Sequence, residues 1–156
     1  MLPLKHTPEG KQFTDIVLEV FKLSALLILE GDKLTKELGL SSARCKVMSS
    51  IVNSQSLWTV PQISRSMGQT RQAVQRLANE LEGDGLLSFK TNPHHKRAKL
   101  LTLTEKGKRK YNKLTQKLIP KANAIADEIS ASELRLTSSV LRKLTNKLET
   151  LGMEIQ

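Results

Sequence analysis

The chain has 156 residues, of which 38% are hydrophobic and 3% aromatic, and its 25 Lys and Arg outnumber 15 Asp and Glu to give a net charge of +10. No apolar run reaches the roughly 18 residues of a membrane span, and the N-terminus lacks the apolar segment of a secretory signal, so we expect a cytoplasmic protein with no membrane partner. A single cysteine, Cys45, excludes an intramolecular disulfide and a cysteine-rich zinc module.

The first predicted element is a long amphipathic helix. Thr7-Pro8-Glu9 is typical of a helix start, with a hydroxyl cap, a proline in the first turn and an early acid that faces the helix dipole. We expect this helix to end near Glu30, at Gly31-Asp32, and a short helical link to cover residues 34–40. The apolar residues that follow the cap at helical spacing begin with Phe13, Ile16, Val17 and Val20.

The next segment predicts two helices separated by a short strand. The pair Ser41-Ser42 can cap a helix whose inward face would hold Val47, Met48, Ile51 and Val52. Leu57-Trp58 is long enough only for a small strand. Thr59 and Gln62 have the spacing of a capping box, so we expect another helix to start there and to end at Gly68.

The segment from Val60 to Glu80 has the spacing of a helix-turn-helix. That motif needs apolar residues at fixed places because its two helices pack at a steep angle. Gly68 stands at the ninth place, where the tight turn favours a positive φ, whereas Gln69 occupies the usually apolar tenth place and departs from the pattern. The apolar places are filled by Val60, Ile63, Met67, Val74 and Leu77.

The second helix of this motif would turn a face rich in hydrogen-bond donors to solvent. No acidic residue occurs between Gly68 and Asn79. An ordinary solvated helix face is the alternative, but the turn glycine, the core spacing and the donor-rich face together favour double-stranded DNA as the partner. The side chains suited to base edges and phosphates are Gln69, Thr70, Arg71, Gln72, Gln75, Arg76 and Asn79.

Beyond this motif the pattern predicts a basic β-hairpin. Residues 86–90 and 98–103 have the apolar patterning of strands and are joined by a basic loop. Residues 88–121 carry 11 basic side chains against one acidic, so the whole excess of positive charge lies there. Such a block attracts polyanions; a solvated face, an acidic lipid surface and an acidic partner are the alternatives. Trp58 and Phe89 are expected in the core.

Two more helices are predicted at the C-terminal end. One opens at Thr104-Glu105 and contains Pro120, where we expect a kink or a break. Ser130 and Glu133 form a second capping box. In the helix that follows, the apolar residues are spaced alternately three and four apart, which places them in one seam that needs a facing partner to bury it. We expect the two chain ends to form a dimer, with intramolecular packing as the alternative. The seam includes Leu141, Leu144 and Leu148.

In the order of these elements, the chain resembles the MarR family of winged-helix transcription regulators. The resemblance is carried by the helix-turn-helix, by Gly85-Leu86-Leu87, by the basic hairpin and by the segment Leu-Thr-Leu-Thr-Glu-Lys-Gly at residues 101–107. Its most specific stretches are residues 67–87 and 92–107. One departure concerns the end of the hairpin loop, where the family commonly has Asp-Arg-Arg and this chain has His95-Lys96-Arg97. The acid that would orient the wing arginine is therefore absent.

The resemblance implies a mainly α fold with a small β-hairpin wing, in which a winged helix-turn-helix is flanked by terminal dimerisation helices. The expected division is an N-terminal dimerisation helix and link (1–40), a DNA-binding domain (41–104) and C-terminal dimerisation helices (105–156). A homodimer would bind a palindromic operator, and a small phenolic or lipophilic effector would relieve regulation. The wing residues that would contact the DNA backbone or minor groove are Lys90, Asn92, His94, His95, Lys96 and Arg97.

The leading hypothesis is therefore a homodimeric, sequence-specific DNA-binding repressor, and the alternative is a winged-helix module that binds an acidic protein. The sequence contains no phosphate-binding glycine loop, no nucleophile with a partner base and no HExxH, so we expect no enzyme. His94-His95 lack further ligands nearby, so we expect no metal and no other cofactor. Cys45 is expected to be a buried structural residue, with oxidant sensing as the alternative.

Overall fold

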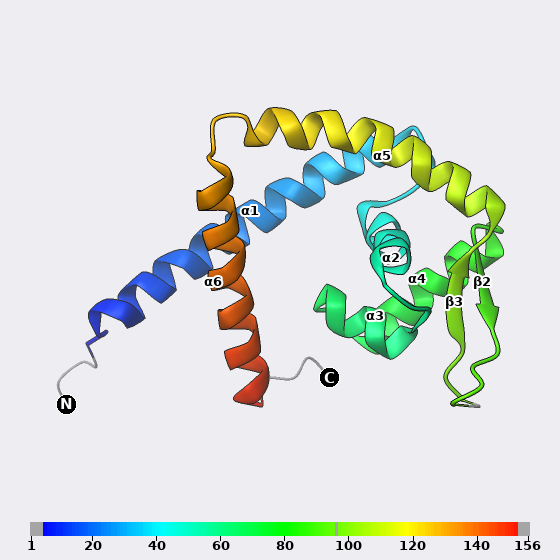
Figure 1. The fold of residues 1–156 in the computed structure, drawn as a ribbon, viewed down its shortest axis with the longest axis horizontal. Coiled ribbons are helices and arrows are strands. Elements are labelled where there is room, and N and C mark those ends of the chain that lie inside the picture. Colours follow the sequence, from blue (N-terminus) through cyan, green and yellow to red (C-terminus); the bar gives the residue numbers. More distant parts are fainter. Residues whose placement is uncertain (1–4, 96, 153–156) are drawn as a thin grey trace. The chain divides into compact units, whose positions relative to one another are not determined.

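The computed structural model describes residues 5–95 and 97–152 (Figure 1). The chain divides into two compact units, one up to Ser42 and one from Ala43 onward. Mainly helical, it carries one small antiparallel sheet, as predicted. Its elements are α1 (Pro8–Lys36), α2 (Ser42–Asn53), β1 (Trp58–Thr59), α3 (Val60–Met67), α4 (Arg71–Gly83), β2 (Leu87–Lys90), β3 (Leu100–Leu103), α5 (Glu105–Ala126) and α6 (Ala131–Thr150).

The first unit is the helix α1 and the turn that follows it. Thr7 caps the helix as predicted, since its Oγ1 accepts a hydrogen bond from the Gly10 backbone N–H at 3.0 Å. The predicted end at Gly31-Asp32 is wrong, because α1 continues to Lys36. A single helical glycine costs only about 1 kcal/mol relative to alanine. The predicted link over residues 34–40 is instead the last turn of α1 and a turn at Gly39, where φ is 60°.

The chain returns past α1 closely enough to explain the glycine. A Cβ on Gly31 would lie 2.9 Å from the Cβ of Ser42. Next to it, the Asp32 carboxylate accepts a hydrogen bond from the Ser42 backbone N–H at 2.8 Å. Gly31-Asp32 therefore makes room for the start of α2 and binds it, rather than ending α1.

The second unit has one apolar core, to which α2, α3, α4, the sheet and the start of α5 contribute. The predicted inward residues of α4 are all buried, which confirms the helical spacing. In α2, Val47 and Met48 are buried, but Val52 is exposed. The core side chains of this unit include Val47, Met48, Val60, Ile63, Val74, Leu77, Ala78, Leu81, Leu86, Leu87, Leu101, Leu103 and Leu114.

The three strands form an antiparallel sheet in the order β1-β3-β2. In the register, β3 places Leu101 between Trp58 of β1 and Phe89 of β2. Both aromatic residues are only half-buried, so their predicted place in the core is wrong. The two hairpin strands are shorter than predicted. Leu86 lies outside β2 because its backbone N–H closes the end of α4 by donating to the Leu81 carbonyl at 2.9 Å.

The start of α5 is bound to the turn that precedes β2. Thr104 caps α5, since its Oγ1 accepts from the Gly107 backbone N–H at 3.0 Å. Its hydroxyl donates to the Gly85 carbonyl at 2.7 Å, and its backbone N–H donates to the Leu86 carbonyl at 3.1 Å. α5 runs through Pro120 unbroken. Proline removes a single hydrogen bond, and the turns on each side keep the helix continuous.

The last helix, α6, begins at the predicted capping box. The Glu133 carboxylate accepts from the Ser130 backbone N–H at 3.0 Å, while the Glu133 backbone N–H donates to the Ser130 hydroxyl at 3.3 Å. Hydrogen bonds from the Ser130 hydroxyl and backbone to the carboxylate hold the pKa of Glu133 below its ordinary value. No residue of α6 is buried, and Leu141 and Leu148 of its apolar seam are exposed.

No helix among the residues that the structure describes is both long and apolar enough to cross a membrane.

Candidate nucleic-acid interface

The outer face of α4 is positioned by the turn before it and by the core beneath it. Gly68 ends α3 in the left-handed conformation, with φ of 60° and ψ of 37°, as the motif requires. Thr70 caps α4 through its Oγ1, which accepts from the Ala73 backbone N–H at 3.2 Å. Four buried residues then fix the inner side of the helix: Val74, Leu77, Ala78 and Leu81.

The structure places every predicted recognition residue at the surface. Because the inner side of α4 is buried, the helical repeat brings the side chains spaced three and four apart onto one outward face. Their contact with DNA stays a prediction, but their accessibility is established. The exposed residues are Gln69, Thr70, Arg71, Gln72, Gln75, Arg76 and Asn79.

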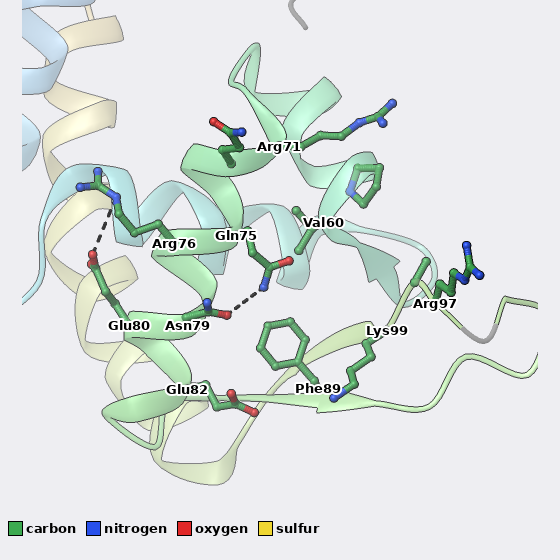
Figure 2. Close-up of a pocket in the computed structure, with 13 residues that line it drawn as sticks. Val60, Arg71, Gln75, Arg76, Asn79, Glu80, Glu82, Phe89, Arg97 and Lys99 are labelled. Atoms are coloured by element: carbon green, nitrogen blue, oxygen red, sulfur yellow. Dashed lines mark hydrogen bonds and ion pairs between the residues drawn. The ribbon is translucent and has the colours of Figure 1, made fainter.

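Two side-chain pairs organise this face, each formed by residues four apart. The Gln75 amide nitrogen, Nε2, donates a hydrogen bond to the Asn79 carbonyl oxygen, Oδ1, at 2.8 Å. Alongside, Arg76 Nε lies 4.0 Å from Glu80 Oε1. Both pairs are solvent-exposed and labelled in Figure 2. The outward face is therefore ordered by contacts within the helix itself.

A groove of about 950 Å³ lies between α4 and the wing, which we define as residues 87–103. Figure 2 shows side chains entering it from both elements. Four cationic side chains and two carboxylates line it, so its charge favours a polyanion. The lining residues are Val60, Pro61, Arg71, Gln72, Gln75, Arg76, Asn79, Glu80, Glu82, Phe89, Arg97, Ala98 and Lys99.

The wing supplies its own cations to the groove. Lys90 and Arg97 are exposed, and Arg97 lines the groove, while the predicted contact of both residues with DNA stays a prediction. Lys99, which no sequence pattern identifies as a contact residue, also lines the groove, with its Nζ 6.0 Å from the centre of the Phe89 ring. That ring is half-buried because it forms part of the groove wall rather than of the core.

The loop of the wing is a turn built on Asn92. The Asn92 Oδ1 accepts a hydrogen bond from the His94 backbone N–H at 3.0 Å, and its backbone carbonyl accepts from His95 at 3.3 Å. The oxygen of Asn92 therefore shapes the loop, while His94 and His95 are exposed at its tip. The predicted contact residue Lys96 lies outside the described residues.

Two acidic residues in the groove were not foreseen. Glu80 and Glu82 both line it, although the sequence stretch free of acids ends at Asn79. The signal that identifies Glu80 is its position four residues after Arg76, which predicts an ion pair on one helix face. For Glu82, only the approach of the wing shows that it borders the groove.

The base of the wing is joined to the core by Asp84. Its carboxylate forms a short ion pair with the Arg44 guanidinium of α2, and its backbone carbonyl accepts a hydrogen bond from Lys106 Nζ at 2.8 Å. The hydrogen bond and charge of Arg44, with smaller effects of Lys110 and Lys106, hold the pKa of Asp84 below its usual value. Next to Arg44, Cys45 is buried, as expected for a structural cysteine.

Among the residues that the structure describes, no three histidine, cysteine or acidic side chains lie together as a set of metal ligands.

The sequence of the chain is related to proteins of mycobacteria. It matches the model of the MarR family over residues 36–98, from the end of α1 into the wing. It is 38% identical over 129 residues to an uncharacterized protein of Mycobacterium tuberculosis, and to one of Mycobacterium bovis, covering 83% of this chain and 89% of each relative.

The fold is similar to several solved structures. A MarR/EmrR family transcriptional regulator from Acinetobacter has a TM-score of 0.79 at 22% identity, with 88% of this chain and 96% of that chain covered. A MarR protein from Peptoclostridium difficile has a TM-score of 0.78 at 18% identity, with 100% and 98% covered. CouR from Rhodococcus jostii, solved with p-coumaroyl-CoA, has a TM-score of 0.75 at 18% identity, with 84% and 92% covered.

Proposed function

The chain belongs to the MarR family of winged-helix transcription regulators, and from this premise we propose that it is a homodimeric repressor that binds a palindromic operator. It is a DNA-binding regulator and not an enzyme, as its family indicates. The observation that carries the proposal is the exposed donor face of α4, which borders the same groove as the cations of the wing. α4 would enter the major groove, where Arg pairs with guanine and Gln or Asn with adenine.

The wing has a separate role in this proposal. Lys90 ends β2 and Arg97 lies before β3, so both belong to the wing and not to the helix that would read base edges. Arg97 would enter the minor groove, where narrow A·T-rich stretches attract guanidinium. Lys90 and the loop residues His94, His95 and Lys96 would contact phosphates, which position the protein but do not specify sequence.

The proposed dimer rests on apolar surface that the described part of the chain does not cover by itself. In α1, Phe13, Ile16 and Val20 are exposed, and Leu18 and Phe21 are even more so, at 61% and 67%. A large exposed apolar surface on a helix is typical of a surface that a partner covers. In α6, the seam residues Leu141 and Leu148 are each more than a third exposed, while Leu144 is half-buried. Both terminal helices therefore have the surface that a second copy would bury.

We also propose that a small lipophilic or phenolic ligand releases the operator. The support is the family together with a solved structure of similar fold, that of CouR bound to p-coumaroyl-CoA, the thioester of a phenolic acid. The ligand would have to bind the DNA-free protein more tightly than the DNA-bound protein. A ligand with equal affinity for both would not shift the equilibrium between them.

A selection from random duplex DNA with the purified protein tests the proposal. We expect enrichment of a palindrome whose half-sites lie about 34 Å, one helical turn, apart. Sedimentation equilibrium should give twice the chain mass. A repeat with aromatic acids and an aromatic acyl-CoA should identify compounds that lower operator affinity. A stable monomer, or the absence of any enriched sequence, would contradict the proposal, and the latter result would favour a module that binds an acidic protein.

A further inference from the structure

Gln75 and Asn79 form a hydrogen-bonded unit on the outward face of α4. The Gln75 Nε2 donates to the Asn79 Oδ1 at 2.8 Å, and both residues are exposed and line the groove beside the wing. Figure 2 shows the two carboxamides joined by this hydrogen bond. Any base that contacts α4 at this position would therefore contact both carboxamides and not one side chain alone.

The pair stands on a rigid support. Val74, directly before Gln75, and Leu77 and Ala78, between the two members of the pair, are buried, at 0%, 6% and 0% exposure. The backbone beneath the two carboxamides is thus fixed, and residues four apart on a helix are neighbours. Hydrogen bonding between them removes much of the rotational freedom that binding would otherwise have to remove.

The internal hydrogen bond determines what the pair offers to a ligand. Each carboxamide has a carbonyl oxygen that accepts and an amino group that donates. With Gln75 donating to Asn79, the Gln75 oxygen stays available as an acceptor and the Asn79 amino group stays available as a donor. Rotating both carboxamides exchanges the two roles but still presents one donor and one acceptor.

One base edge in the major groove complements this set. Adenine offers an acceptor at N7 and an amino donor at N6, whereas guanine offers two acceptors at N7 and O6. Against guanine, the carbonyl oxygen of the pair would face a second carbonyl oxygen, and leaving such a group buried without a partner is unfavourable. Cytosine offers only its amino donor, and thymine only its O4 acceptor beside a methyl group.

We propose that Gln75 and Asn79 act as one reading unit that selects adenine, in an A·T pair, at a single position of each half-site. This inference rests on the proposed function, because it requires α4 to lie in the major groove. It differs from a general preference of Gln and Asn for adenine in one respect: two residues specify one base together, so that losing either loses the same preference.

Selections with Gln75→Ala, Asn79→Ala and the double variant test the shared reading. Wild type should enrich adenine at one position of each half-site, and each single variant should lose the preference there and nowhere else. Replacing that adenine by guanine should weaken wild-type binding by about 5- to 150-fold. For the double variant, the same replacement of adenine by guanine should weaken binding by less than about 2-fold. Alanine favours helix more than Gln or Asn, and circular dichroism checks that α4 stays folded.

Gln75→Glu makes a stronger test because it predicts a new base. Asn79 must then donate its amino group to the carboxylate, which leaves two acceptors facing outward. Two acceptors complement the amino group of cytosine, so the preferred base should change from adenine to cytosine at the same position. Gln116→Glu, on the exposed surface of α5, adds the same charge outside the groove and should leave the preferred base unchanged.

The outcomes separate this inference from the proposed function. Enrichment by wild type that neither alanine variant alters would contradict the reading unit alone. Changes at two different positions would show that the residues read separately, and an equal loss of affinity on all sequences would show that they contact phosphate; each result would also overturn the inference. Failure of wild type to enrich any sequence would contradict both.

Discussion

A Cβ atom on Gly107 would lie 2.0 Å from the backbone carbonyl oxygen of Leu86. That carbonyl also accepts the Thr104 backbone N–H at 3.1 Å, so the first turn of α5 lies directly against the chain entering β2. Leu86 itself is completely buried. The glycine of the Thr-Glu-Lys-Gly segment is thus required by the close approach of two backbones.

Gly107→Ala should therefore destabilise the protein by about 3 kcal/mol or more, because a backbone carbonyl cannot move aside as a flexible side chain can. Urea unfolding followed by circular dichroism measures the change. Gly83→Ala is the matched control, since no atom lies within 4 Å of the added Cβ at the end of α4. It should be neutral or stabilising by up to about 1 kcal/mol. Equal effects of the two substitutions would contradict the close approach.

The ion pair of Asp84 with Arg44 predicts a pH dependence of stability. The hydrogen bond and charge of Arg44 lower the pKa of Asp84 from 3.8 in the folded chain. The unfolded state then binds the proton more readily than the folded state does. The contribution of Asp84 to the free energy of unfolding is therefore complete above pH 3.8 and is lost as the pH falls through the lower pKa of the folded chain. Wild type should exceed Asp84→Asn in unfolding free energy at pH 7, and the difference should disappear in acid.

Urea titrations of both proteins between pH 7 and about pH 2.5 check this dependence, because the window brackets the ordinary pKa of an aspartate. Glu128→Gln is the control, since it removes one exposed carboxylate away from Arg44 and should change stability by under about 0.5 kcal/mol. A difference between wild type and Asp84→Asn that stays constant over the whole range would contradict the lowered pKa.

Substitutions on α4 and on the wing should have different effects on DNA binding. Arg71→Ala should weaken the preferred operator by about 1–3 kcal/mol and relax base preference, because an arginine in the major groove reads guanine. Lys90→Ala, which removes a proposed phosphate contact of the wing, should weaken binding to all sequences and lower the salt slope by about 1. Fluorescence anisotropy at several salt concentrations separates the two. An equal loss on operator and random DNA for Arg71→Ala would assign it to phosphate contact.

The proposed dimer predicts that a charge in the α6 seam separates the subunits. Leu141→Glu should lower the mass measured by sedimentation to that of one chain and should weaken operator binding, because each subunit would then hold a single half-site. Asn146→Glu adds the same charge on the opposite side of α6, where it is exposed, and should leave both properties intact. Loss of dimerisation in both variants would point to a general effect of charge, and loss in neither would contradict a dimer through this seam.

The helix-turn-helix was predictable because its residues obey local rules. Buried positions on α4 follow the helical repeat, and Gly68 has the positive φ that its place in the turn requires. The capping boxes at Thr59 and Ser130 are equally local, and both form as predicted; Gln62 Oε1 accepts from the Thr59 backbone N–H at 2.9 Å. The outward donors of α4 followed from the same repeat.

The errors concern residues whose role depends on distant parts of the chain. Gly31 permits the return of the chain at Ser42, whereas the sequence around it predicts the end of a helix. Phe89 has the apolar side chain expected of a core residue, but it forms part of the groove wall, with Lys99 above its ring. Glu82 borders the groove because the wing folds back toward α4. No periodicity within one element could show these relationships.

The ratio of dissociation constants for the selected operator and for a scrambled duplex of equal length, measured at physiological salt, tests the central claim most directly. If α4 reads bases, the scrambled duplex should bind at least about 10³-fold more weakly, as is typical of specific DNA-binding proteins. Equal dissociation constants for the two duplexes would show that the protein binds phosphate charge alone and would contradict the account.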